Sequence, residues 1–337
     1  MGLPLKEFVT PVRKEIDLHA LQGKVVGIDT YNYLYAYLMA IRASGRALEF
    51  DGRVTSHLNG FFYKIIEMLK FDIRPVFVVE GEKIEEKKEE LEKRRQFRDE
   101  AKTKAAKAFM DGNIKQYNKY MAMCETITPE MITDFKRLVR AFGLPFLTAG
   151  SEAEAQIAYM NRKEDVWGTA TQDYDALLFG AKRMVRNLLR NKTMKIHGKE
   201  IILNKEVINL PRLLDHHKIT QEQLIDIGIL NGTDFNKGVD GVGIKTALKY
   251  IKKYGNAEGV IDNVEKVSDQ IKIEEIDQIR KIYSKPKVET EYKLEFTLPN
   301  MKKVAFLMVK KFGFNFDRVV SAIKGLKKSN IYVKRLI

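Results

Sequence analysis

The sequence contains one cysteine, Cys124, among its 337 residues. A single cysteine excludes an intramolecular disulfide and is typical of a reducing intracellular compartment. No apolar run approaches the length of a membrane span, and the N-terminal MGLPLKEFVT lacks the apolar core of a signal peptide. We therefore predict a soluble intracellular protein, in the cytoplasm or nucleoid if the source is prokaryotic, that does not contact a membrane.

The sequence also lacks a linker rich in proline, glycine or serine. Its length would permit one large domain or two modest ones, and its 45% hydrophobic content can bury a substantial core. Because no linker divides the chain, we predict a single domain over residues 1–337.

Short apolar runs separated by helix-like segments predict an α/β fold with a mostly parallel central sheet flanked by helices. The expected strands lie in KVVGIDT, RPVFVVEG, LPFLTA and VWGTATQD, and the expected helices include Ser56–Lys70, 129–142 and 152–161. The segments MVRNLL and IHGKEIILN are expected to form a β-hairpin at the sheet edge.

Between Glu82 and about Tyr120 the sequence changes to strong helix formers with almost no large apolar residues. A helix that is polar on every side packs against little and is held by charge pairs one turn apart. Acids cluster before Glu92 and bases after it. This pattern indicates a mobile arm with one end that attracts phosphate.

Acidic residues stand where short apolar runs stop. In an open α/β sheet the loops after parallel strands converge on one crevice, so acids from distant positions can meet there. Clustered carboxylates repel one another unless cations bind between them, and Mg2+ takes oxygen ligands. The seven acids, which are enough to hold two such ions, are Asp29, Glu80, Glu152, Glu154, Asp173, Asp175 and Asp234.

Each acid taken singly has a simpler interpretation. Glu152 and Glu154 follow Ser151, as in a capped helix whose first turn favours negative charge. Asp29 could cap the helix that follows it, and the acids after VWGTATQ could be turn residues. Repetition at several strand ends in a basic chain favours the metal site.

The net charge is the second strong signal. The chain has 59 Lys and Arg against 45 Asp and Glu, a formal charge of +14 at pH 7. The stretch from Met301 to Ile337 contains ten bases and one acid. A basic face binds the phosphates of nucleic acids, and an acidic pocket inside a basic protein is what a metal-dependent phosphodiesterase requires.

A glycine-rich segment, NGTDFNKGVDGVGIKTALKYIKKYG, precedes and enters an expected helix. It is not a P-loop, because Ile244 separates Gly243 from Lys245. The sequence therefore gives little support to an NTPase. The glycines and the lysines after them instead predict a helix-hairpin-helix clamp whose backbone groups hold one phosphate strand.

The segments GIDTYNYLY, VVEGE, GSEAEAQIAYM, TQDYDALLFGA and NGTDFNKGVDGVGIKTAL together resemble the flap endonuclease family. These enzymes are structure-specific 5′ nucleases of DNA replication and repair, with 5′-3′ exonuclease activity. The match is colinear from Met1 to about Gly255 and weak beyond Val260. It implies a two-metal site formed by the same seven acids, a helical arch over 82–128 and a DNA-binding element over 232–254. The charge pattern adds a basic C-terminal segment over 300–337.

The resemblance also assigns roles to residues outside the acids. Lys87 and Arg94 correspond to arch residues that contact the scissile phosphate, and their separation by two helical turns would place them on one helix face. Tyr35 corresponds to a residue that stacks on the neighbouring base. The further expected DNA contacts are Gly2, Gly232, Gly241, Gly243, Lys245 and Lys249.

The implied mechanism is hydrolysis of a phosphodiester by two Mg2+ ions, with Mn2+ as a substitute and K+ at the glycine-rich element. One ion activates a water and the other stabilises the leaving 3′ oxygen. The expected partner is branched DNA with a 5′ flap, bound by a monomer. Two alternatives stay open: a catalytically weak DNA-junction-binding protein, and a sibling 5′ exonuclease or bubble nuclease.

Two positions depart from the family pattern. Glu80 replaces the usual aspartate with a side chain one methylene longer, which affects the expected rate and metal preference. The usual C-terminal motif for binding a sliding clamp, a glutamine followed by an aliphatic and two aromatic residues, is missing from KGLKKSNIYVKRLI. The sliding-clamp partnership therefore stays open.

Overall fold

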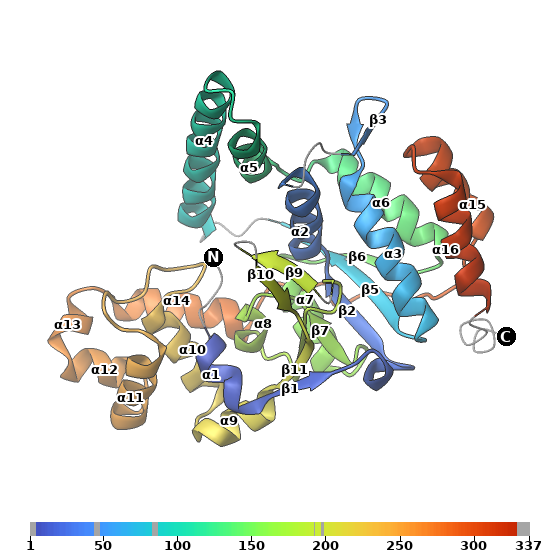
Figure 1. The fold of residues 1–337 in the computed structure, drawn as a ribbon. Helices are drawn as coiled ribbons and strands as arrows, with labels where there is room; N and C mark the ends of the chain where they lie inside the picture. Colours follow the sequence, from blue (N-terminus) through green and yellow to red (C-terminus); the bar gives the residue numbers. More distant parts are fainter. Residues whose placement is uncertain (1–4, 44–47, 83–86, 192, 197–198, 329–337) are drawn as a thin grey trace. The chain divides into compact units, whose positions relative to one another are not determined.

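A computed structural model describes residues 5–43, 48–82, 87–191, 193–196 and 199–328 (Figure 1). Gly2 lies outside the described residues. The chain divides into two compact units. The first comprises Met1–Asp17, Glu80–Glu90 and Thr148–Thr290, and the second comprises Leu18–Val79, Leu91–Leu147 and Glu291–Ile337. The single domain expected over residues 1–337 stays a prediction.

The first unit contains four sheet strands in the order β1 (Arg13–Ile16), β11 (Lys205–Asn209), β8 (Arg183–Arg186) and β7 (Gly168–Ala170). Strands β7 and β8 are parallel, whereas β11 is antiparallel to both β8 and β1. The α/β class is confirmed, and the sheet is mixed because β11 runs antiparallel to both of its neighbours. Strands β9 (Thr193–Ile196) and β10 (Lys199–Ile202) pair only with each other in the described residues.

The hairpin expected between MVRNLL and IHGKEIILN is wrong. Val185 of β8 pairs with Val207 of β11, and the hairpin lies instead between β9 and β10. The physical reason is burial: Met184 and Val185 are both fully buried, so β8 is an interior strand with a partner on each side. An apolar run of this length predicts a strand but not its partners.

The helices of the first unit include a group gathered around α10 (Gln221–Asn231), visible in Figure 1. Residues 224–230 of α10 are buried on every side, because α11 (Ile244–Tyr254), α12 (Ala257–Asn263) and α14 (Ile273–Ser284) pack around it. Helix α11 instead buries only Ala247 and Ile251, so its lysines face outward. The other helices of this unit are α1 (Lys6–Val9), α7 (Ala153–Arg162), α8 (Asp175–Leu178), α9 (Leu210–His217) and α13 (Glu265–Ser268).

The turn between α10 and α11 has glycine at three positions with positive φ. Gly232, Gly238 and Gly241 have φ values of +101°, +72° and +75°, which L side chains rarely adopt. A Cβ atom on Gly238 would also lie 2.4 Å from the backbone nitrogen of Gly232. The glycines therefore allow two backbone segments to approach closely, as the sequence indicates, and the DNA-binding role of this turn stays a prediction.

The second unit contains β2 (Val25–Asp29), β5 (Arg74–Val79) and β6 (Phe146–Thr148) in this order, with β2 and β5 parallel. These strands confirm three of the expected apolar runs. The expected helix over Ser56–Lys70 is α3, with the same bounds. Phe61 of α3 contacts the rings of Phe77 and Phe135, which form part of the core of this unit.

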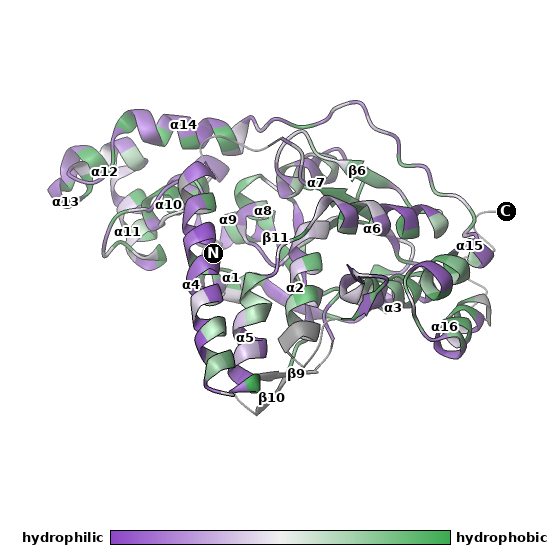
Figure 2. Cartoon of the chain, turned by 90° about the horizontal axis from the view of Figure 1, so that it is seen from above, coloured by the Kyte–Doolittle hydropathy of each residue, from purple (hydrophilic) through white to green (hydrophobic). Residues whose placement is uncertain are grey.

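The charged segment forms two helices, α4 (Lys88–Met110) and α5 (Ile114–Cys124), instead of one polar helix. Figure 2 shows α4 as largely hydrophilic, with apolar residues near the end that leads into α5. Ala101, Ala105 and Ala108 are buried on α4, and Phe109 lies 5.5 Å from the ring of Tyr117. The expectation of a helix polar on every side is therefore wrong. Alanines form a buried stripe along α4, and such small side chains are easily overlooked among the many charged residues of this segment.

The remaining elements of the second unit are α2 (Thr30–Ala43), β3 (Glu49–Phe50), β4 (Arg53–Val54), α6 (Pro129–Ala141), α15 (Met301–Phe306), a π-helical turn (Leu307–Lys311) and α16 (Phe316–Lys328). Helices α15 and α16 pack on α6 and α3, respectively. In the part of the chain that the structure describes, no helix is both long and apolar enough to cross a membrane.

Candidate active site

The predicted acids of the first unit stand at the ends of its strands and helices. Asp173 lies between β7 and α8, Asp175 begins α8, and Asp234 lies in the turn after α10. Glu152 directly precedes α7, and Glu154 lies in its first turn. Lys87 forms ion pairs with both Glu152 and Asp234, and the Asp173 carboxylate accepts the backbone N–H of Asp175, so the fold brings these acids together.

Lys87 lies among these acids. Its Nζ atom is 2.5 Å from Oε2 of Glu152 and 3.5 Å from Oδ2 of Asp234, and it lies over the ring of Phe235. Burial lowers the pKa of Lys87, but the Glu152 and Asp234 carboxylates more than offset this effect and raise it above its ordinary value. Lys87 is therefore a charged lysine that neutralises part of the acid cluster.

Two of the acids have pKa values above the ordinary value, mainly because they are buried. Burial raises the pKa of Asp175 well above its ordinary value, and the nearby Asp173 and Asp234 raise it further. Burial and Asp234 likewise raise the pKa of Asp173. Carboxylates held this close in a desolvated site favour either protons or metal cations.

Thr171 organises the turn that carries the two aspartates. Its hydroxyl donates to Oε1 of Glu154 at 3.0 Å and accepts the backbone N–H of Asp173 at 3.1 Å. The Asp173 carboxylate accepts the backbone N–H of Asp175 at 3.3 Å. The strand end, the aspartate turn and the first turn of α7 are therefore linked by short-range hydrogen bonds.

Of the two helix caps that the sequence suggests, one is present in the structure and the other is not. Asp29 does cap α2, because its Oδ1 atom accepts the backbone N–H of Asn32 at 3.3 Å. The expected cap at Ser151 is wrong: Glu152 occupies the N-cap position of α7, and Ser151 donates its hydroxyl to the carbonyl of Lys287 instead. Glu152 makes no side-chain cap either, since its carboxylate binds Lys87.

The other predicted residues lie in different surroundings. Asp29 is buried at the end of β2 in the second unit. Glu80 follows β5 and is exposed, unlike Glu152 or Asp175. Arg94 is exposed on α4, and Lys87 precedes the first residue of that helix. Tyr35 is half-buried on α2.

The acids of the first unit fit hard divalent cations by their chemistry. Among the described residues no three metal-ligating side chains form a ready cluster, and Lys87 lies among the acids instead. However, Oδ1 of Asp175 is buried and has no hydrogen-bond partner among the described residues. A buried carboxylate oxygen without a partner is costly, and a cation would remove that cost.

Sequence reasoning missed Tyr283, which interacts directly with this site. Its hydroxyl donates to Oδ2 of Asp175 at 3.1 Å from a position 108 residues further along the chain. Tyr283 lies on an amphipathic helix as an ordinary core residue would, so no local signal identifies it.

The lysines of α11 form a second charged region, which we call the α11 lysine face: Lys245, Lys249, Lys252 and Lys253. All four are exposed. Lys245 forms an ion pair of 2.8 Å with Glu7, and both side chains remain largely in water. Such an exposed pair contributes little to stability.

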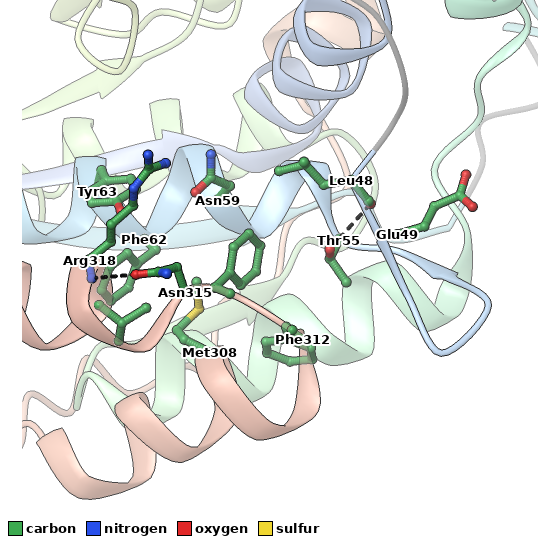
Figure 3. Close-up of a pocket in the computed structure, with 13 residues that line it drawn as sticks. Leu48, Glu49, Thr55, Asn59, Phe62, Tyr63, Met308, Phe312, Asn315 and Arg318 are labelled. Atoms are coloured by element: carbon green, nitrogen blue, oxygen red, sulfur yellow. Dashed lines mark hydrogen bonds between the residues drawn. The ribbon is translucent and has the colours of Figure 1, made fainter.

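A cavity of about 300 Å³ lies in the second unit (Figure 3). It is lined by residues of the β3–β4 region, α3 and the segment before and within α16, including Phe62, Tyr63, Phe312 and Arg318. None of the predicted site residues lines it.

Two family models match the chain. Residues 1–101 match the XPG N-terminal domain and residues 143–234 match the XPG I-region. The first region contains Asp29 and Glu80, and the second contains the other five predicted acids. Fold and sequence together therefore define an XPG-type protein.

Similar proteins define the family further. Flap endonuclease 1 of Sulfolobus acidocaldarius is 41% identical over 334 residues, which cover 97% of this chain and 95% of that protein. The structure of flap endonuclease-1 from Methanococcus jannaschii matches with a TM-score of 0.74 and 32% identity, and covers 99% of this chain and 100% of that one. The chain belongs to the flap endonuclease family.

The catalytic core of Rad2 in complex with DNA substrate matches with a TM-score of 0.73 and 22% identity, and covers 96% of this chain and 100% of that one. At this identity the match supports the fold alone. The predicted family and α/β class are therefore confirmed, and the roles of the individual residues stay predictions.

Proposed function

We propose that this flap endonuclease hydrolyses DNA phosphodiesters where a single-stranded 5′ flap joins a duplex, in replication and repair. Enzymes of this family are metal-dependent DNA hydrolases. The observation that carries the proposal is the buried acid cluster around Lys87, in a chain with a formal charge of +14. An acidic site that binds cations, within a protein that attracts polyanions, suits phosphodiester hydrolysis.

The seven acids are proposed to hold two divalent ions, Mg2+ or Mn2+, which when bound activate a water and stabilise the leaving oxygen. In this proposal the buried Asp175 and Asp234 and the half-buried Asp173 supply oxygens from the first unit. Glu152 and Glu154 act from the start of α7, while Asp29 and Glu80 complete the set. Thr171 keeps Glu154 and the aspartate turn in register through its two hydrogen bonds.

Lys87 is proposed to have two partners in turn. In the metal-free protein its ammonium neutralises Glu152 and Asp234. With divalent ions held by these acids, the Lys87 side chain would be available to contact the scissile phosphate together with Arg94. Both side chains would then stabilise the negative charge that develops on the phosphate oxygens.

DNA is proposed to bind the glycine turn and the α11 lysine face through its backbone, without reading sequence. Gly232, Gly241 and Gly243 allow a phosphate or a K+ ion to approach the turn, while Lys245 and Lys249 supply charge. Gly2 and Tyr35 are proposed to contact DNA near the scissile bond. We further propose that the protein acts as an intracellular monomer, with a sliding clamp as a candidate partner.

The test is cleavage of end-labelled DNAs that differ only in structure: 5′-flap, nicked, bubble and single-stranded. We expect the flap to be cut fastest in Mg2+, and no cleavage in EDTA. Flap binding without cleavage in either Mg2+ or Mn2+ would favour the junction-binding alternative. Faster cleavage of the bubble or of single strands would favour a sibling nuclease.

A further inference from the structure

Tyr283 is held in one position by its surroundings. It lies near the end of α14 and is 2% exposed. Its ring packs between Phe179, at 4.7 Å, and Phe235, at 5.4 Å. Arg280, one turn earlier on α14, forms two bonds of 2.6 and 2.7 Å to Asp226 of α10. The tyrosine hydroxyl therefore has little freedom to move.

The two oxygens of the Asp175 carboxylate have different environments. Oδ2 accepts the hydroxyl proton of Tyr283 at 3.1 Å, whereas Oδ1 is buried without a hydrogen-bond partner among the described residues. Asp175 is itself only 3% exposed. Because the hydrogen bond holds Oδ2 in place, the carboxylate cannot rotate freely. Oδ1 therefore points in a defined direction.

We propose that Tyr283 is a positioning residue, whose hydroxyl fixes Oδ2 of Asp175 so that Oδ1 is presented to a divalent cation. The proposal rests on the metal site proposed above. Hydrogen bonds to metal-ligating carboxylates orient them, and their loss typically costs 10- to 100-fold in metal affinity. Mg2+ is sensitive to such errors because it demands near-ideal octahedral geometry.

The direct test replaces only the hydroxyl, with Tyr283→Phe. Calorimetric titration of Mg2+ and Mn2+ into the metal-free protein, without DNA, measures the affinity. We expect about tenfold weaker binding or more. Mn2+ tolerates distorted sites better, so its affinity should fall less than that of Mg2+. The same thermal unfolding midpoint in EDTA would show that the ring still packs.

Tyr159→Phe is the matched control, because it makes the same chemical change on α7, where the half-buried ring lies under Lys163. It should bind both ions as the wild type does. A second comparison uses Asp175→Asn: if Tyr283 acts through Asp175, adding Tyr283→Phe to that variant should cause no further loss of metal affinity. This cycle separates positioning from a general effect on packing.

The outcomes distinguish the two proposals. If the wild type binds the ions and cuts flap DNA, and Tyr283→Phe binds them equally well, the role of Tyr283 is overturned while the proposed function stands. An equal loss from Tyr283→Phe in the wild-type and Asp175→Asn backgrounds would also overturn it. If the wild type neither binds divalent ions nor cuts DNA, both proposals fail together.

Discussion

Two lysines of the first unit show how burial changes the role of a charge. Lys87 and Lys245 each pair with a carboxylate, at 2.5 and 2.8 Å, but 16% of the Lys87 side chain is exposed against 83% for Lys245. The exposed pair is screened by water and contributes little. The buried pair compensates charges that the fold has taken out of water, so breaking it leaves acids unpaired.

The same contrast separates the two charged regions. Burial raises the pKa of Asp173 and Asp175 in the acid cluster around Lys87, so these two carboxylates favour bound protons or cations. The α11 lysine face stays in solvent, and we propose that it binds phosphates over a broad surface without fixed geometry. Substitutions in the first region should therefore change chemistry and metal binding, and substitutions in the second should change affinity for DNA.

The largest expected effect comes from Asp175→Ala. Cleavage of a 5′-flap DNA in Mg2+ should fall at least about a thousandfold, because a buried metal ligand is lost. Flap affinity should stay within about threefold of the wild type, since the α11 lysine face is unchanged. Single-turnover kinetics and a binding titration measure the two effects.

The exposed Asp262→Ala on α12 is the control for that variant and should cut normally. Rapid Mg2+-dependent cleavage by Asp175→Ala would contradict the assignment of Asp175 to the metal site.

The next effect contrasts Lys87→Met with Lys245→Met. Lys87→Met should slow single-turnover cleavage about a hundredfold by removing charge from the scissile phosphate. It should also destabilise the metal-free protein by about 2 kcal/mol, because Glu152 and Asp234 lose their counter-charge. Mg2+ should restore most of that stability.

Lys245→Met should leave the unfolding midpoint unchanged, and so should Lys88→Met, which is exposed at the start of α4. Equal unfolding midpoints for all three variants in EDTA would mean that the buried Lys87 contributes no more to stability than the exposed lysines.

A smaller effect is expected at Glu80, the exposed acid of the set. Glu80→Gln should reduce cleavage in Mg2+ by about tenfold through loss of charge. Glu80→Asp should retain or raise the rate, because the shorter side chain restores the geometry usual in the family. Single-turnover rates in Mg2+ and Mn2+ compare the three proteins. Equal rates for wild type and Glu80→Gln would remove Glu80 from the site.

Lys245→Ala combined with Lys249→Ala should weaken binding to every duplex-containing substrate by a similar factor of a few. The slope of log affinity against log salt should fall by about 2, since two phosphate contacts are lost. Fluorescence titration over a salt series measures both. Lys272→Ala with Lys281→Ala removes the same charge from exposed positions at α14 and should have less effect. Equal slopes in both double variants would place the DNA contact elsewhere.

The smallest effect concerns pH. Burial, with Asp173 and Asp234, raises the pKa of Asp175 in the folded protein. The folded state then binds more protons than the unfolded chain above the ordinary pKa of about 4, so metal-free stability falls as the pH rises through this window. Asp175→Asn removes this titration and should raise the unfolding midpoint at pH 7 in EDTA by about 2–4 °C. Parallel pH profiles for both proteins would contradict the assignment.

Much of the local structure could be predicted from sequence because the signals are local. The apolar face of α3 repeats at helical spacing, so the structure keeps its predicted bounds. The run at β2 is short and rich in β-branched residues, which predicts a strand, and the structure confirms it. Partners were less predictable: β8 pairs with β7 and β11 and forms no edge hairpin, because pairing depends on which faces the whole fold buries.

The sequence by itself determined the family, the basic character and the positions of the seven acids, because strand ends and glycine turns are read from neighbouring residues. Only the tertiary structure decided what each acid faces. Lys87 reaches Glu152 across 65 residues, and Tyr283 reaches Asp175 across 108. Burial raises the pKa of Asp175, and burial is a property of the folded chain that no single segment contains.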